Sequence, residues 1–246
     1  MPGDRHRRLF SKLMEGVKEL DTERLCEVCV EATGTSGAGI MIMSGDIPTG
    51  SLQTTNDVSA LIEELQFALR EGPCLDAFHQ RRPILEPDLA NPSDVRWMAF
   101  SGPALEAGVR AIFGFPLHVG EVRLGALNLY RDSPGPLSAE QHADALAMAD
   151  IVTRSIIVMQ AHASPGQLAL ELEVGADLEL VVHQATGMVA AQLGVSVAQA
   201  LIRLQAYAFG NDRPLRSVAT EVVARGVRFA GADGVDGVER YDPLPC

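Results

Sequence analysis

The sequence predicts an α+β protein in two parts, and three observations support this. Apolar stretches at 109–119 and 122–130 surround the dipeptide Gly120-Glu121, a pattern typical of an antiparallel hairpin. Segments with helical spacing of apolar residues flank this hairpin. After a break at Pro165-Gly166, three short amphipathic segments predict a small helical bundle. The expected boundaries are 1–162 for a mixed unit with a mostly antiparallel sheet, 163–230 for an all-α three-helix bundle, and 231–246 for an acidic, glycine-rich, disordered tail.

Composition excludes several classes of protein. With 47% hydrophobic and 21% charged residues, the chain is not intrinsically disordered. A net charge of −12 disfavours a protein that coats duplex DNA, because neutralising phosphates requires a basic surface. Lysine occurs only at Lys12 and Lys18, and the sequence contains no P-loop motif. A phosphoacceptor receiver domain is also excluded, since it needs a lysine after a late strand.

We expect a cytoplasmic protein that does not cross a membrane. No uncharged apolar stretch reaches the roughly 18 residues that a spanning helix needs. The first residues are charged and lack the apolar core of a signal peptide. In a reducing compartment the cysteines are expected to be free thiols. They are Cys26, Cys29, Cys74 and Cys246.

The elements of the first part follow from spacing and turn residues. Leu61, Leu65 and Leu69 recur at helical spacing and predict one buried face for the helix at 58–69. Gly34 and Gly37 end the predicted helix at 22–33, and the short apolar run at 39–43 is predicted to form a strand. The predicted order is helices at 4–19 and 22–33, strands at 39–43 and 51–55, a helix at 58–69, a turn into a short helix at 71–78, a strand at 83–89, a helix at 96–107, and the two hairpin strands.

The most regular predicted helix is 138–160, and its apolar stripe has two interpretations. The stripe could pack on the sheet of its own domain, or it could form a two-heptad seam with a second copy. Both interpretations can hold at once if the stripe is broad. Its residues are Ala145, Ala149, Val152, Ile156 and Met159.

The second part contains three amphipathic helices with tight turns. Residues 168–174 alternate as a strand would, but they are strong helix formers and are assigned to a helix. Gly194 ends the first bundle helix, and Ser196 caps the second. The expected inward faces are Leu178, Val181, Val182, Ala185, Met188 and Val189 in the first helix, Val197, Ala200, Leu201, Leu204 and Ala208 in the second, and Leu215, Val218, Ala219, Val222 and Val223 in the third.

Residues 183–223 resemble the ANTAR domain, a three-helix RNA-binding module of bacterial transcription antiterminators. The resemblance covers about 45 residues, and the helix lengths agree. The residues that carry it are Ala185 and Gly187 in the first helix, Gly194, Ala200 and Leu204 around the second, and Leu215, Val218 and Ala219 in the third.

Residues 20–160 resemble a GAF domain, a sensory α/β module. The segments that carry this resemblance are 65–78, 88–97 and 108–131. The order GAF then ANTAR is similar to that of actinobacterial GAF–ANTAR regulators. The resemblance implies a signal-controlled dimer that binds nascent RNA as paired hairpins, so that a terminator hairpin cannot form.

The resemblance also implies which residues contact RNA, and two of them depart from the family pattern. The family's Ala-Lys-Gly is here Ala-Thr-Gly, with Thr186 expected on the exposed side of its helix. The family's arginine after the second-helix leucine is Gln205. Each missing cation removes one counterion-release contribution, so a dimer that acts through a protein partner without RNA is the alternative. The expected RNA-binding residues are His183, Ala185, Thr186, Gly187, Arg203, Gln205, Arg213 and Arg216.

The GAF resemblance implies a small-molecule ligand held between the sheet and its covering segments. Each candidate side chain has a simpler interpretation as a packing or surface residue. The sequence does not identify the ligand or any cofactor; a haem would need an axial histidine, for which His79 and His118 are available. The candidate ligand-binding residues are Cys74, Asp76, His79, Arg96 and Trp97.

Neither catalysis nor metal binding is expected. Cys26 and Cys29 form a single C-x-x-C pair within a helix, whereas zinc takes four ligands and a redox pair sits at a helix N-terminus, so both cysteines are assigned to the core. The enzymatic alternative is a GAF-type thiol enzyme that reduces methionine sulfoxide. Cys74 would be its nucleophile, but no suitably spaced resolving cysteine follows before Cys246. We therefore expect a regulator.

Overall fold

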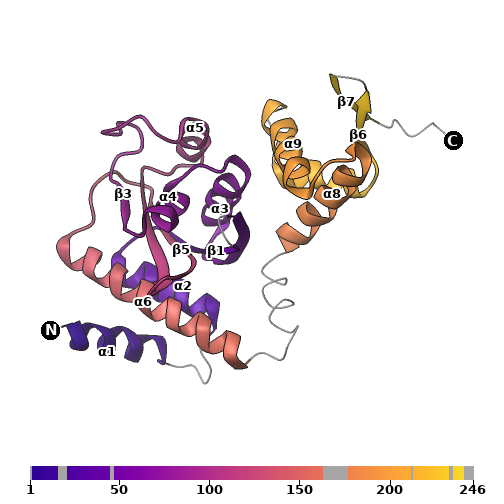
Figure 1. The fold of residues 1–246 in the computed structure, drawn as a ribbon. Coiled ribbons are helices and arrows are strands. Elements are labelled where there is room, and N and C mark those ends of the chain that lie inside the picture. Colours follow the sequence, from indigo (N-terminus) through magenta and orange to yellow (C-terminus); the bar gives the residue numbers. More distant parts are fainter. Residues whose placement is uncertain are drawn as a thin grey trace. The chain divides into compact units, whose positions relative to one another are not determined.

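The structure is a computed structural model, and it divides into two compact units, residues 1–175 and 176–246 (Figure 1). The expected domain boundary after residue 162 and the helix expected at 168–174 lie outside the described residues. Each unit is therefore considered by itself. The structure describes residues 2–15, 21–44, 47–162, 177–211, 213–232 and 235–240.

The first unit contains a five-stranded sheet in the order β2-β1-β5-β4-β3, and every neighbouring pair is antiparallel. The predicted hairpin forms its centre, and Gly120 adopts a positive φ of 56° in the turn. The mostly antiparallel sheet expected from the sequence is thus confirmed. The strands are β1 (Gly37–Ser44), β2 (Ile47–Thr54), β3 (Ile84–Glu86), β4 (Ala111–Val119) and β5 (Val122–Arg131).

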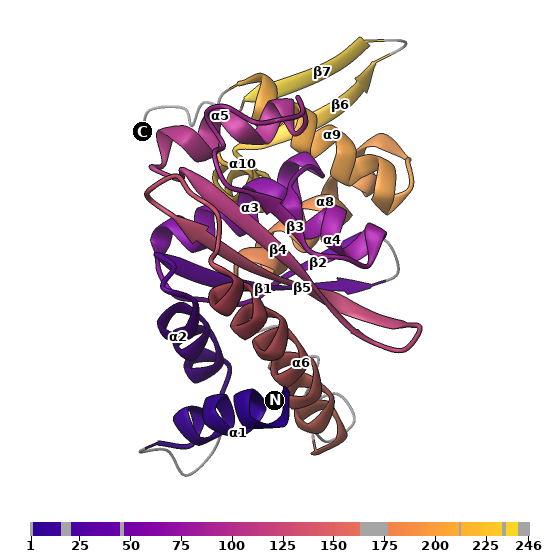
Figure 2. The ribbon, with the colours of Figure 1, turned by 90° about the vertical axis from the view of Figure 1, so that its left-hand side faces the viewer.

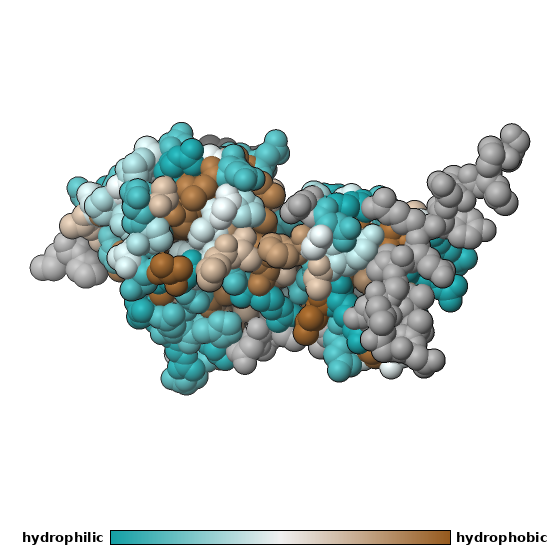
Figure 3. Space-filling view, turned by 90° about the horizontal axis from the view of Figure 1, so that it is seen from above, coloured by the Kyte–Doolittle hydropathy of each residue, from teal (hydrophilic) through white to brown (hydrophobic). Residues whose placement is uncertain are grey.

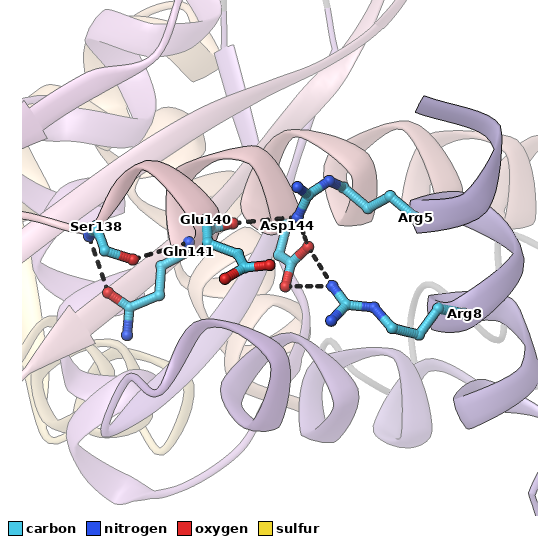
Figure 4. Close-up of polar contacts among 6 residues, drawn as sticks. All are labelled: Arg5, Arg8, Ser138, Glu140, Gln141 and Asp144. Atoms are coloured by element: carbon cyan, nitrogen blue, oxygen red, sulfur yellow. Dashed lines mark hydrogen bonds and ion pairs between the residues drawn. The ribbon is translucent and has the colours of Figure 1, made fainter. Parts of the chain in front are cut away.

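Helices α2 and α6 cover one face of this sheet, and α1 packs against these two helices from outside, as Figures 1 and 2 show. Helix α1 lies on α6, where Asp144 pairs with Arg5 and accepts two hydrogen bonds from Arg8 Nη2 at 2.6 and 2.7 Å (Figure 4). Burial of Leu9 and Leu13 completes the attachment. The helices span α1 Pro2–Leu13, α2 Thr22–Thr33 and α6 Ala139–His162, so α1 ends before the predicted residue 19.

The apolar stripe of α6 packs on the sheet of its own unit. Ala145 and Val152 are fully buried, and Ala149 and Ile156 are at most 5% exposed, in one cluster with inward residues of β4 and β5. Met159 is only partly buried. Of the two interpretations of this stripe, packing on the sheet of its own unit is the one that the structure shows, because the sheet covers the apolar face.

The other face of the sheet carries α3 (Asp57–Leu69), α4 (Pro73–Gln80) and α5 (Met98–Glu106). Helix α3 buries the predicted leucine face only in part, since Leu65 and Leu69 pack against the apolar cluster while Leu61 is 37% exposed. Its buried side instead contains Ile62, Glu63 and Gln66. The prediction failed because α3 approaches the sheet at glycine positions, which place polar side chains of the helix against the strand backbone.

The second unit begins with three packed helices, α8 (Asp177–Leu193), α9 (Val197–Gly210) and α10 (Leu215–Val223). Ser196 and Gln199 form a capping box at the start of α9, as the predicted cap requires. Most of the predicted inward residues are buried, but Val181, Met188 and Val223 are only partly buried and Val197 is 60% exposed; the side chain of Leu178 lies outside the described residues. The buried core includes Val182, Ala185, Val189, Ala200, Leu201, Leu204, Ala208, Leu215, Val218, Ala219 and Val222.

A hairpin follows the bundle, where the sequence analysis placed a disordered tail from 231. Strand β6 (Val227–Ala232) pairs antiparallel with β7 (Val235–Arg240). Phe229 anchors it, because its amide donates to Gln192 Oε1 at 2.9 Å and its ring meets Tyr207 edge-on at 5.5 Å. The dipeptide Asp233-Gly234 was the sequence signal for such a hairpin.

None of the helices within the described ranges is long and apolar enough to span a membrane.

Candidate functional site

Three of the five candidate ligand residues in the first unit contact one another. The Trp97 indole donates to Asp76 Oδ2 at 3.0 Å. The Arg96 guanidinium lies 4.3 Å from the centre of the Trp97 ring and reaches Glu86 Oε2 at 3.4 Å. These contacts hold the segment before α5 onto α4 and β3, and they use the polar groups that a ligand would otherwise meet.

Trp97 itself has an unusual backbone conformation. Its φ of 55° is left-handed, which is rare for a bulky residue and strained. The first turn of α5 is capped from another element, since the amide of Ala99 donates to Glu71 Oε2 at 3.0 Å. Beside Trp97, Val95 and Met98 are 85% and 81% exposed. Figure 3, seen from the side where α5 lies, shows apolar residues among polar ones on this unit.

The remaining two candidates, Cys74 and His79, lie on α4 together with Asp76. Cys74 is 1% exposed, and burial raises the pKa of its thiol well above the usual value. A buried thiol of this kind is a poor nucleophile, which disfavours the thiol-enzyme alternative. His79 and His118 are both exposed, so neither points into the interior where a haem would be held.

A polar cluster that the sequence did not predict lies beneath α3 and α4. Glu63, Gln66 and Asn128 are each at most 2% exposed. Asn128 pairs with Gly39 on one neighbouring strand and with Gly114 on the other. The two glycines flanking Asn128 in the sheet admit the helices closely, and they were the available signal. An acid on an amphipathic helix is normally read as exposed.

Burial raises the pKa of Glu63 to about 8, and the neighbouring Asn128 amide lowers it by a smaller amount. Within the described residues, neither Glu63 oxygen has a well-formed hydrogen bond, and Gln66 Nε2 and Asn128 Oδ1 also lack partners. Gln66 Oε1 accepts from the Cys74 amide at 2.8 Å. The carboxyl of Glu63 is therefore largely protonated at neutral pH.

In the second unit, the eight expected RNA-binding residues fall into two groups according to their exposure to solvent. The exposed or partly exposed group can meet a ligand directly, whereas the buried group cannot. The first group is His183, Gly187, Arg203, Arg213 and Arg216; the second is Ala185, Thr186 and Gln205.

Thr186 does not lie on the exposed side of α8, contrary to expectation. It is 2% exposed, and its hydroxyl donates to the Val182 carbonyl one turn earlier at 2.6 Å. Gln205 on α9 is 9% exposed. The two positions that depart from the family pattern, Thr186 and Gln205, thus belong to the packed interior of the bundle. Their polar groups interact with other groups there.

Arg213 is engaged within the bundle. Its guanidinium donates to Glu221 Oε2 at 3.0 Å, to the second Glu221 oxygen, and to Ser217 Oγ at 3.1 Å. The hydrogen bonds to Glu221 raise the pKa of Arg213. Arg216 is the more exposed of the two arginines. The charge of Arg213 is partly neutralised before any RNA arrives.

Two family models match the chain in sequence. The model of the GAF domain matches residues 22–154, and the model of the ANTAR domain matches residues 176–223. The ANTAR match ends at the last residue of α10, so the β6–β7 hairpin lies beyond it. No curated protein matches the chain in sequence.

Solved structures resemble the chain at low identity. A GAF domain from an Acinetobacter phosphoenolpyruvate-protein phosphotransferase has 12% identity, covers 65% of this chain and 96% of that one, and gives a TM-score of 0.49. The corresponding domain from Coxiella burnetii has 14% identity, covers 65% and 95%, and gives 0.48. A type II free methionine-R-sulfoxide reductase from Thermoplasma acidophilum has 14% identity, covers 61% and 94%, and gives 0.39.

Proposed function

The chain belongs to the GAF domain family and carries an ANTAR domain after it, and on this premise we propose that it regulates transcription by antitermination on nascent hairpin RNA. GAF is a sensor domain and ANTAR an RNA-binding antitermination domain, so the chain is a sensory regulator. In the proposed scheme the GAF unit (residues 1–175) receives a signal, and the ANTAR unit (residues 176–246) binds RNA.

The ANTAR match carries this proposal, since it spans the described helices α8, α9 and α10. Outward residues of α8 leave an open face at Gly187, where an added Cβ would meet nothing within 4 Å, and His183 stands one turn earlier. RNA loops are recognised by polar side chains and close backbone approach, which such a face permits. Arg216 adds an exposed cation.

We further propose a cytoplasmic homodimer. Outward apolar residues on the helical layer of the GAF unit support this, because Phe10 on α1 and Val158 on α6 are 53% and 54% exposed. They replace the buried α6 stripe as the candidate contact. A small-molecule ligand of the GAF unit is part of the same proposal; near Asp76, Arg96 and Trp97 it would have to displace the contacts that these residues make with one another.

Capture of RNA from cells with the tagged full chain tests the function. We expect enrichment of leader RNAs with two adjacent hairpins near terminators. The matched control is Gly187→Trp, which blocks the open face of α8 without a core contact, and it should lose the enrichment. Equal recovery of unrelated RNAs by both proteins would reject antitermination.

One observation favours a second function, in which the bundle contacts a protein instead of RNA. The positions where the family carries a lysine and an arginine are here Thr186 and Gln205, and both are buried. A bundle without these cations has less charge for RNA, and it could instead contact a protein. In that case the same capture would recover a protein in place of hairpin RNA.

A further inference from the structure

The cluster of Glu63, Gln66 and Asn128 is not used by the proposed RNA function. Four polar atoms of these side chains have no partner in good hydrogen-bond geometry in the part of the chain that the structure describes, although the Asn128 amide lies close enough to Glu63 to lower its pKa. Leaving a buried polar group unpaired costs free energy, and natural folds keep few of them. Three such residues together, in a sensor domain, point to a site that binds something.

Close packing around the cluster limits the space that is available to a ligand. An added Cβ would lie 2.7 Å from Glu63 Oε1 at Gly39 and 2.5 Å from Gln66 Oε1 at Gly72. At Gly114 it would lie 2.4 Å from the Pro73 carbonyl oxygen, which belongs to α4. Helices α3 and α4 therefore rest directly on the sheet, and the Gln66 side chain joins them by contacting Gly72 and the Cys74 amide. This close approach favours the smallest ligand, a proton, over an organic molecule.

We propose that Glu63 is a proton switch of the GAF unit: its carboxyl holds a proton while α3 is packed on the sheet at β1 and β2, and it releases that proton to solvent when α3 separates. The proposal rests on the proposed sensory function and names proton activity as a signal. Ionisation leaves a carboxylate that the packed interior cannot hydrate, so water must reach it or the helix must move. Either change loosens the α3 layer.

The groups that face Glu63 support this assignment. The titratable neighbours are Cys74 of α4, on the same side of the sheet, and Cys26 of α2, on the opposite side; burial raises the pKa of both thiols, so they stay neutral. Asn128 of β5 and Gly39 of β1 carry no charge. No ion pair between described residues includes Glu63. With no cation beside it, the pKa of Glu63 stays raised, at about 8.

Tryptophan fluorescence can report on the packing of α3. Trp97 is the single tryptophan, and it shares an apolar cluster with Ile62, the residue next to Glu63 on α3. We expect the fluorescence of the full chain to show a one-proton transition centred near pH 8. Glu63→Gln should abolish it. Glu64→Gln, which changes the partly exposed neighbouring acid on the same helix, should leave it in place.

A second variant decides the question if Glu63→Gln fails to fold. The Asn128 amide favours the ionised carboxyl, so Asn128→Leu should move the midpoint to higher pH. A transition that survives in Glu63→Gln, a midpoint that does not move in Asn128→Leu, or no transition in the natural protein would overturn the proposal. RNA binding is measured separately on both sides of the transition. A fluorescence switch without binding to any hairpin RNA would keep the proton site and reject the proposed function.

Discussion

The two units bury polar side chains in different ways. In the ANTAR unit, Thr186 satisfies its hydroxyl within its own helix, by donating to the Val182 carbonyl. In the GAF unit, Glu63 and Asn128 have polar atoms without partners among the described residues. Burying a polar group that has a hydrogen-bond partner costs little free energy, so such a residue serves only the packing of the fold. Unpaired burial of an acid instead couples folding to protonation, so the same degree of burial has different consequences in the two units.

The largest expected effect is the dependence of GAF-unit stability on pH. The pKa of Glu63 rises from an ordinary value of 4.5 to about 8 in the folded protein, so the folded chain keeps a proton that the unfolded chain loses. The stability linked to this proton is complete below pH 4.5 and is lost as pH rises to about 8. Relative to Glu63→Gln, we expect the natural protein to lose about 1.4 kcal/mol per pH unit in that window. Urea unfolding at a series of pH values measures this, and parallel pH profiles would contradict it.

A smaller effect on stability is expected when a charged side chain replaces Thr186 in the ANTAR unit. Thr186→Lys places an ammonium where the present side chain is 2% exposed and removes the hydrogen bond to Val182. We expect a loss of about 2–4 kcal/mol in the free energy of unfolding. His183→Lys, on the exposed side of the same helix, is the control and should change stability little. If both variants unfold at the same urea concentration as the natural protein, Thr186 is not buried as described.

The smallest effect concerns two arginines of the ANTAR unit. Arg213 is already paired with Glu221, whereas Arg216 is more exposed. Arg216→Ala should therefore reduce the slope of log affinity against log salt for a two-hairpin RNA by about one. Arg213→Ala should reduce it less. Filter binding over a range of salt concentrations makes the comparison, and the reverse order would show that the Arg213–Glu221 pair opens on binding.

Local features of the sequence predicted much of the fold. The turn at Gly120-Glu121 and the apolar strands around it predicted the β4–β5 hairpin, because turn chemistry and strand alternation act over a few residues. Ser196 predicted the start of α9 for the same reason. The β6–β7 hairpin was missed because glycine and acid content outweighed the short alternation of Val227 and Phe229.

The candidate sites were predicted less well, since they depend on which elements meet. Arg96 and Trp97 were identified, but their contacts with Glu86 and Asp76 join three separate segments. The apolar stripe of α6 allowed a partner helix or a sheet, and periodicity does not distinguish the two. Only the sheet beneath Val152 decided between them.

By itself the sequence determined the α+β class, the order of the two domains and the inward faces of the ANTAR bundle, because these follow from the spacing of apolar residues along single helices and strands. Tertiary structure alone decided that Glu63 is buried and Leu61 exposed. That choice depends on Gly39, which lies on a strand distant from α3 in the chain and allows Glu63 to approach the sheet. Burial is set by the approach of distant segments, so the protonation of Glu63 can be inferred only once those segments are in place.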